Sequence, residues 1–121
     1  MTDTPNFFSD YLAAWATNDV DLVMRYFSDD VEFLDVTMGH GAKGVSEMRT
    51  FVENSFLFVP DATFEYLRHF ESGDDYAIEW VMRLQPSDPG IPGVSIGRRT
   101  NGLISRHRDY WNGAAMHPSP S

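Results

Sequence analysis

The sequence contains no cysteine. That absence excludes a disulfide scaffold, a thiolate zinc site and a cysteine nucleophile. No stretch approaches the roughly 18–20 consecutive apolar residues of a membrane helix, so we expect no membrane partner. Residues 1–5 include neither a basic residue nor an apolar segment, and we expect no signal peptide there. These features are compatible with a cytoplasmic protein, which is the location we expect.

Positive charge is scarce as well. The chain has 9 lysines and arginines against 18 acidic residues, and its formal net charge is −9. Such a surface repels a phosphate backbone, so no nucleic-acid partner is expected. The one basic cluster lies on a predicted hairpin, where we interpret it as a solvated strand face paired with nearby acids. It consists of Arg98, Arg99, Arg106 and Arg108.

What the chain does have is enough apolar material for one core. Its 121 residues suit a single domain, and hydrophobic and aromatic residues make up 42% and 14% of them. We expect that domain to occupy residues 1–112. Small residues and proline dominate residues 113–121, which predicts a flexible tail.

The first half of the chain has helical periodicity. The first predicted helix has an N-cap and first helical position at Thr4-Pro5. Its apolar face consists of Phe7, Phe8, Tyr11, Leu12 and Trp15. A short second helix, capped by Asn18-Asp19, buries Val20, Val23, Met24 and Phe27 and ends at Asp29-Asp30. A third helix, capped by Ser46 and ended by Pro60-Asp61, buries Met48, Phe51, Val52, Ser55 and Phe56.

The remainder has the pattern of strands. Residues 31–35 form a first short strand, and the glycines of residues 39–44 predict a loop. Long strands follow over residues 63–70, 76–84, 92–99 and 103–111, with Asn101-Gly102 as a type I′ hairpin turn. Helices first and antiparallel strands afterwards indicate an α+β domain with its helices on one face of the sheet.

Strand alternation predicts which side chains point inward. Ile78, Trp80, Met82 and Leu84 share the apolar face of their strand. In the last strand, the outward set is Ile104, Arg106, Arg108 and Tyr110. The inward set therefore includes His107, Asp109 and Trp111. On the first strand, Asp35 shares its face with Val31 and Phe33.

Two inward aspartates are unusual, because a buried lone carboxylate needs a partner or a raised pKa. Together with one histidine they would lie in an aromatic and methionine wall, which is typical of a small-molecule site. We expect an apolar ligand there, in contact with Trp15, Phe33, Phe51, Trp80, Met82 and Trp111. The catalytic candidates are Asp35, His107 and Asp109.

Each polar candidate has a structural alternative. Asp35 is either a proton shuttle or an acid that caps the following loop. Asp109 is either an acid/base group that acts with His107 or a structural carboxylate. Same-face neighbours lie roughly 6.5–7 Å apart along a strand, so we expect a water or ligand between them. We interpret His40 and His69 as surface residues, and no three ligands converge on a predicted metal site.

Three stretches carry a family pattern. The first is residues 11–31. The second is residues 31–44, which begin with Val-Glu-Phe-Leu-Asp and end with Lys-Gly. The third is residues 101–112, which contain Asn-Gly-Leu-Ile and Arg-Asp-Tyr-Trp-Asn. Together they resemble the nuclear transport factor 2-like superfamily, and within it the SnoaL-like polyketide cyclases, ketosteroid isomerases and limonene epoxide hydrolases. The resemblance implies a cone-shaped curved sheet, antiparallel or mixed, with the N-terminal helices on its concave face. It also implies a homodimer, to which an outward Ile104 and Tyr110 would contribute.

The resemblance carries over only in part. Asp35 lies where ketosteroid isomerases place their general base, although the proline that usually follows is missing. Asp109 lies where limonene epoxide hydrolases place one carboxylate of an Asp-Arg-Asp triad. The other two triad positions fall on Trp80 and Met82, which argues against epoxide hydrolysis. The position nearest to the isomerase's acidic oxyanion donor is Ser95.

Three functions remain open on the sequence alone. The first is a cofactor-free acid/base enzyme for a polycyclic or ketone-bearing apolar compound, which would isomerise, cyclise or dehydrate it. The second is a non-catalytic carrier or sensor for such a compound. The third is a scaffold whose cone is filled by its own side chains.

Overall fold

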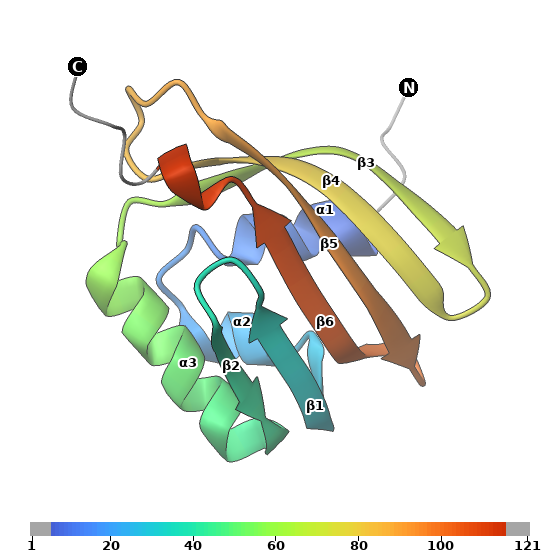
Figure 1. The fold of residues 1–121 in the computed structure, drawn as a ribbon. Coiled ribbons are helices and arrows are strands. Elements are labelled where there is room, and N and C mark those ends of the chain that lie inside the picture. Colours follow the sequence, from blue (N-terminus) through green and yellow to red (C-terminus); the bar gives the residue numbers. More distant parts are fainter. Residues whose placement is uncertain (1–5, 116–121) are drawn as a thin grey trace.

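The computed structural model describes residues 6–115, which form three α-helices, six strands and a short 3-10 helix (Figure 1). In chain order the helices are α1 (Phe7–Ala14), α2 (Val20–Met24) and α3 (Gly44–Phe58). The strands are β1 (Phe27–Asp35), β2 (His40–Lys43), β3 (Thr63–Ser72), β4 (Asp75–Arg83), β5 (Ile91–Thr100) and β6 (Leu103–Trp111). The 3-10 helix, η1, is Gly113–Ala115.

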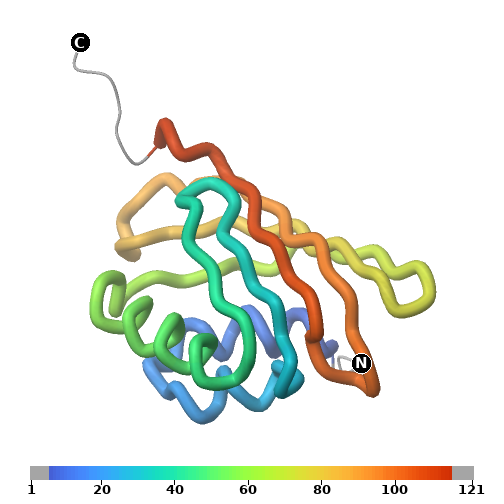
Figure 2. The backbone as a smooth tube through the Cα atoms, turned by 60° about the horizontal axis from the view of Figure 1, so that its bottom comes forward, coloured from blue at the N-terminus to red at the C-terminus, as the bar shows by residue number. Residues whose placement is uncertain are grey.

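All six strands belong to one mixed sheet in the order β2-β1-β6-β5-β4-β3. Neighbours are antiparallel except β1 and β6, which run parallel. The sheet curves around the helices without closing into a barrel, with α1 against one half and α3 beside β1 and β2 (Figure 2). The expected α+β cone with helices on the concave face is confirmed.

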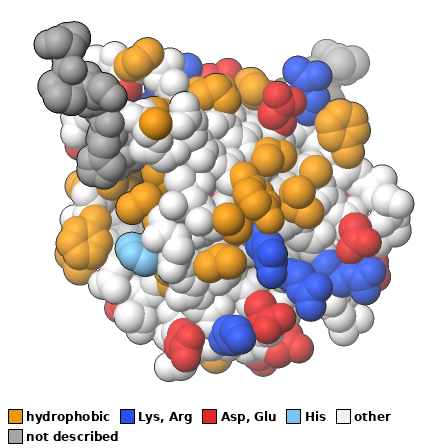
Figure 3. Space-filling model, in the orientation of Figure 1, with side chains coloured by type: hydrophobic (Ala, Val, Ile, Leu, Met, Phe, Trp, Pro, Cys, Tyr) orange, Lys and Arg blue, Asp and Glu red, His pale blue; other side chains and the backbone are white. Residues whose placement is uncertain are grey.

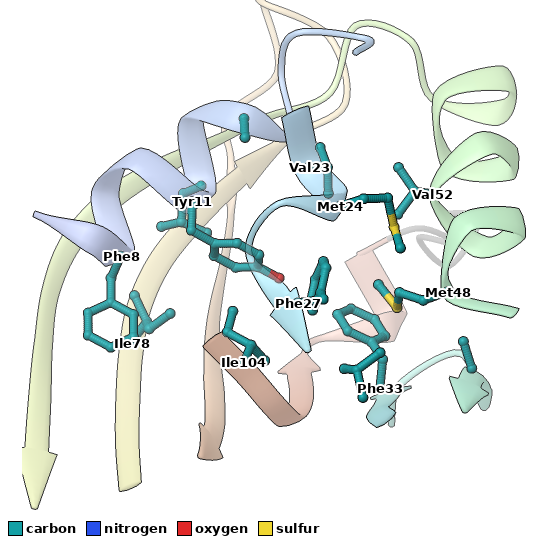
Figure 4. Packing of buried hydrophobic residues seen from close by; sticks show 14 of the residues in the cluster. Phe8, Tyr11, Val23, Met24, Phe27, Phe33, Met48, Val52, Ile78 and Ile104 are labelled. Atoms are coloured by element: carbon teal, nitrogen blue, oxygen red, sulfur yellow. The ribbon is translucent and has the colours of Figure 1, made fainter. Parts of the chain in front are cut away.

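The core fills the space between the helices and the concave face (Figure 4). Tyr11 and Phe8 of α1 pack toward Ile78 of β4, while Met48 and Val52 of α3 pack toward the side of β1. The alternation along β4 is as expected, since its buried residues are every second one from Tyr76 to Met82. The apolar stripes of the three helices thus face a common interior.

Two helix starts differ from the sequence-based expectation. Asn6 caps α1, because its Oδ1 accepts a hydrogen bond from the Phe8 N–H at 2.9 Å. The expected cap at Thr4-Pro5 lies outside the described residues. Helix α3 begins before Ser46, so Ser46 is not its cap; instead the Glu47 carboxylate accepts from the Lys43 N–H at 3.0 Å. An acid in the first turn can satisfy a free N–H as well as a serine can.

The chain between α2 and α3 forms more strand than its glycines and aspartates predict. The second helix ends at Met24, not at Asp29-Asp30, because residues from Phe27 onward pair with β6. The predicted loop over residues 39–44 contains β2, which pairs with β1. Gly41 permits this, since a Cβ there would lie 2.5 Å from the Phe33 carbonyl oxygen. Pairing satisfies the backbone polar groups that a loop would leave to water.

A β-bulge near the start of β6 reverses the predicted outward orientation of one residue. Arg98 pairs with Arg106 and Arg99 pairs with Ile104, so Ser105 is an extra residue. Ile104 is therefore fully buried, and the expectation that it points outward is wrong. Beyond the bulge the alternation is as predicted: His107 is buried, whereas Arg106 and Arg108 are exposed.

The ends of the chain are described only in part. Of the predicted flexible tail, residues 113–115 form η1, and residues 116–121 lie outside the described residues. None of the helices in the described part of the chain is long and apolar enough to cross a membrane.

Candidate functional site

A cavity of about 210 Å³ lies between the concave face and the C-terminal halves of α1 and α3, and it opens to solvent. Its wall is mainly aromatic and aliphatic. Every predicted site residue lines it: Trp15, Phe33, Asp35, Phe51, Trp80, Met82, His107, Asp109 and Trp111. Their roles in binding or catalysis stay predictions.

The parallel pairing of β1 with β6 brings the polar groups together. Asp35 is the register partner of Asp109, and Phe33 is the register partner of His107. Residues in register on neighbouring strands point to the same face, so both carboxyl groups enter the cavity side by side. The Phe33 ring stacks on the imidazole of His107 with centroids 5.0 Å apart and 13° between the planes.

The contact between His107 and Asp109 is direct. His107 Nε2 lies 2.8 Å from Asp109 Oδ1, so the expected water or ligand between them is not needed. The spacing along a strand refers to the backbone, and two side chains that lean toward each other close that gap. His107 is almost fully buried, and a fifth of the Asp109 side chain is exposed toward the cavity.

Two further residues hold this pair, and sequence reasoning gave neither of them this role. The Ser95 hydroxyl donates to Asp109 Oδ1 at 2.5 Å and accepts from the Trp80 indole N–H at 2.8 Å. On the other side of the imidazole, the Tyr76 hydroxyl lies 2.7 Å from His107 Nδ1. Extending the alternation of β4 back by one step from Ile78 puts Tyr76 on the inward face with Trp80, which is the signal that could have identified it.

Asp35 has a different environment. The Trp111 indole N–H lies 3.2 Å from both carboxylate oxygens, and the Met38 N–H donates to Oδ1 at 3.1 Å. Burial raises the pKa of Asp35 and the charge of Asp109 adds to the rise, while the Met38 and Trp111 hydrogen bonds oppose it. Asp35 thus both caps the β1–β2 turn and lines the cavity, so its two readings are compatible.

The raised pKa of Asp35 predicts a pH-dependent stability. The folded protein binds this proton more readily than the unfolded chain, whose aspartate has a pKa near ~3.9. The free energy of unfolding of the wild type, relative to Asp35→Asn, should therefore fall as pH rises from about 3.9 through the folded-state pKa. Urea unfolding of both proteins at a series of pH values measures this difference. A difference that rises with pH would contradict the assignment.

The remaining charged candidates lie elsewhere. His40 is exposed on β2, and His69 contacts the Tyr66 hydroxyl at 2.8 Å and the Glu71 carboxylate at 3.2 Å. Arg98 pairs with Asp75 at 2.9 Å and Arg106 approaches a glutamate on β1 at 3.7 Å, as a solvated strand face would. Within residues 6–115 no group of three or more histidine or acidic side chains is placed to hold a metal ion.

Comparison with known proteins identifies a family. The model of the SnoaL-like domain matches residues 8–107. The chain is 32% identical over 106 residues to the cyclase aurE of Calcarisporium arbuscula, a match that covers 78% of each chain.

Solved structures share the fold at lower identity. One is a hypothetical protein of ketosteroid isomerase-like fold from Catenulispora acidiphila, in complex with trimethylamine. It is 17% identical, with a TM-score of 0.77 over 91% of this chain and 88% of that one. Another is TerC co-crystallised with polyporic acid, 14% identical, with a TM-score of 0.77 over 91% of each chain.

Proposed function

The chain belongs to the SnoaL-like family, and on that premise we propose that it binds a small apolar carbonyl compound in its cavity and catalyses acid/base chemistry on it without a cofactor. The observation that carries the proposal is the meeting of Asp35 and Asp109 in one aromatic-walled cavity. A cyclase as relative and TerC's co-crystallisation with polyporic acid support the same class of function.

The cavity suits a compact ring compound. An apolar cavity of about 150 Å³ holds benzene, so the roughly 210 Å³ here has room for a somewhat larger ring system. Its carboxyl and imidazole groups lie on one side, where β1 and β6 meet. A mostly apolar wall with a few placed polar groups orients a ligand by its oxygen atoms. The empty volume also disfavours the scaffold hypothesis.

The proposed reaction begins at Asp35. Its carboxylate takes a proton from the carbon next to a carbonyl, the C–H electrons form a C=C bond, and the carbonyl oxygen becomes an enolate. A raised pKa makes Asp35 a stronger base than an exposed aspartate. Asp35 now holds that proton. Asp109, oriented by His107, acts in its protonated form: its carboxyl hydrogen either donates a hydrogen bond to the enolate oxygen or is transferred to a carbon of the ligand, and Asp109 regains a proton when Asp35 releases the one it took. Isomerisation, aldol ring closure and dehydration all share this first step.

Tryptophan emission offers a direct test of binding, because all three tryptophans of the chain line the cavity. We expect a two-ring aromatic ketone to quench their fluorescence saturably, and glucose to have no effect. In Ser55→Phe the added ring would occupy the cavity, so the dissociation constant should rise by at least about 10-fold. Quenching that is linear in ketone and equal in both proteins would contradict binding in the cavity.

A carrier or sensor is the second candidate. The observation that favours it is that Asp109 Oδ1 is hydrogen-bonded to Ser95 and His107, as a carboxylate that only stabilises the cavity wall would be. The two candidates differ in the fate of the ligand. A carrier would return the bound ketone chemically unchanged after hours of incubation, and it would retain affinity in Asp35→Asn.

We also propose that two copies pair through the outer face of the sheet. Hydrophobic side chains gather over β4, β5 and β6 on that face, with positively charged side chains beside them (Figure 3). Arg106 and Arg108 of β6 are exposed. Ile96 of β5 is about half exposed there. An apolar patch of this kind on a sheet face is typical of an interaction surface.

The pairing predicts a solution mass of two chains by light scattering. Ile96→Glu should reduce it to one chain, because a carboxylate at the centre of an isologous contact would meet its own copy. Leu57→Glu on α3, where Leu57 is also exposed, is the matched control and should leave the mass unchanged. A wild type that has the mass of one chain would contradict the proposal.

A further inference from the structure

Tyr76 is a buried group that the proposed reaction does not use. It lies on β4 with 4% of its surface exposed, and it is not among the residues that line the cavity. Its hydroxyl lies 2.7 Å from His107 Nδ1, while the other ring nitrogen, Nε2, lies 2.8 Å from Asp109 Oδ1. Since His107 is 1% exposed, water does not compete for either nitrogen.

The hydrogen atoms in the contacts from Tyr76 to His107 and from His107 to Asp109 can be assigned. Burial raises the pKa of Tyr76 far above that of a free phenol, so the hydroxyl keeps its hydrogen. Within residues 6–115 the hydrogen-bond partner of that hydroxyl is His107 Nδ1. If the hydroxyl donates, Nδ1 accepts, and a neutral imidazole then carries its hydrogen on Nε2. That N–H points to Asp109 and donates to it.

The other protonation states fit worse. An imidazolium, or the tautomer with hydrogen on Nδ1, would make the Tyr76 hydroxyl an acceptor. Its own hydrogen would then be buried without an acceptor among the described residues, which is costly. The other groups that face the ring are Phe33 of β1, which is uncharged, and Tyr11 of α1, whose hydroxyl lies 3.5 Å from Nε2. Neither takes the place of Tyr76 at Nδ1.

We propose that Tyr76 is a positioning residue: it holds His107 in the Nε2–H tautomer. The neutral imidazole of His107 then donates its Nε2–H to Asp109 and orients that carboxyl group. Two donors, the His107 N–H and the Ser95 hydroxyl, then occupy Asp109 Oδ1. Asp109 Oδ2 has no hydrogen-bond partner among residues 6–115, and it is the atom that exchanges a proton with the ligand. The role of Oδ2 rests on the proposed function, whereas the tautomer does not.

Nitrogen NMR of protein labelled with ¹⁵N-histidine tests the tautomer without any ligand. The chain has four histidines, and the signals lost in His107→Gln identify the pair of interest. In the wild type near pH ~7 we expect Nδ1 to be unprotonated and Nε2 to be protonated. In Tyr76→Phe that pattern should be lost, because the ring keeps its packing but Nδ1 loses its donor. Tyr11→Phe is the matched control and should keep the pattern, since 3.5 Å is too long for a strong bond.

Each outcome decides the inference. A protonated Nδ1 in the wild type, or an unchanged pattern in Tyr76→Phe, would overturn it. On a compound that the wild type converts, Tyr76→Phe should lower kcat by about 10–100-fold with little change in KM, as misorientation of a catalytic group does. If no compound is converted but the tautomer is as expected, the proposed catalysis fails and the assignment of Tyr76 stands.

Discussion

In an Asp109→Asn variant we expect turnover to fall by at least about 100-fold while the fold is retained. Asparagine has nearly the same shape, and its Oδ1 can still accept from the Ser95 hydroxyl and the His107 N–H. What it lacks is a second oxygen that can take up or release a proton. The change therefore removes proton transfer and leaves the hydrogen bonds of the wall in place.

The measurement is kcat on any ketone that the wild type converts, combined with circular dichroism to confirm folding. Asp35→Asn should give a loss of similar size, since it removes the proposed base. Asp21→Asn provides the control, because Asp21 pairs with Arg49 on the surface, away from the cavity. Full activity in both Asp35→Asn and Asp109→Asn would exclude the acid/base mechanism and favour a carrier.

Replacing Trp80 with alanine should lower the free energy of unfolding by about 3–5 kcal/mol. The indole is 2% exposed, packs edge-on against Phe64 at 5.4 Å and donates to the Ser95 hydroxyl. Gly93 lies so close that a Cβ there would be 2.3 Å from two carbons of the ring. Truncation therefore leaves a void and also removes the donor that orients Ser95.

Urea unfolding followed by circular dichroism measures this loss. Trp80→Phe is the matched variant, since it keeps an aromatic ring in the wall but removes the N–H together with part of the fused ring system. Its loss should be about 1–2 kcal/mol, the size expected for one buried hydrogen bond with a small change in packing. If Trp80→Ala cost less than about 1 kcal/mol, the cavity wall would be far more adaptable than its packing indicates.

Much of this fold is predictable from two local features of the sequence: the alternation of apolar and polar residues along strands, and the residues that favour turns. Asn101-Gly102 marks a hairpin whose two residues both have positive φ, as the turn requires. Alternation from Ile78 to Met82 identifies one wall of the core because a side-chain period of two holds along any regular strand. The same rule put His107 and Asp109 on the inner face, where the structure has them.

The errors arise where pairing between strands decides the outcome. A bulge at Ser105 buries Ile104, and an extra residue of this kind leaves no mark on the composition of the strand. Strand β2 forms although two of its neighbours are glycines, because β1 offers an edge for it to pair with. Such pairings depend on residues far away in the chain, which a local pattern does not contain.

The same limit applies to the site. Sequence reasoning proposed two aspartates and a histidine, but it did not foresee that Tyr76 and Ser95 would hold them. Tyr76 lies on β4 and Ser95 on β5, whereas the residues they contact lie on β6. Their contacts therefore depend on the register of these three strands. Register is fixed to within one residue only once the whole sheet is assembled.

The parallel pairing of β1 with β6 determines when the cavity can form during synthesis. Asp35 and Trp111 touch across 76 positions of sequence, so at about 5–20 residues per second the ribosome adds Trp111 several seconds after Asp35. During that interval β1 has only β2 as a partner, and its other edge is open to wrong pairing. A nascent chain stalled before residue 103 would therefore lack His107, Asp109 and the β6 wall of the cavity, and it would carry an exposed strand edge, which makes it a natural client for a chaperone.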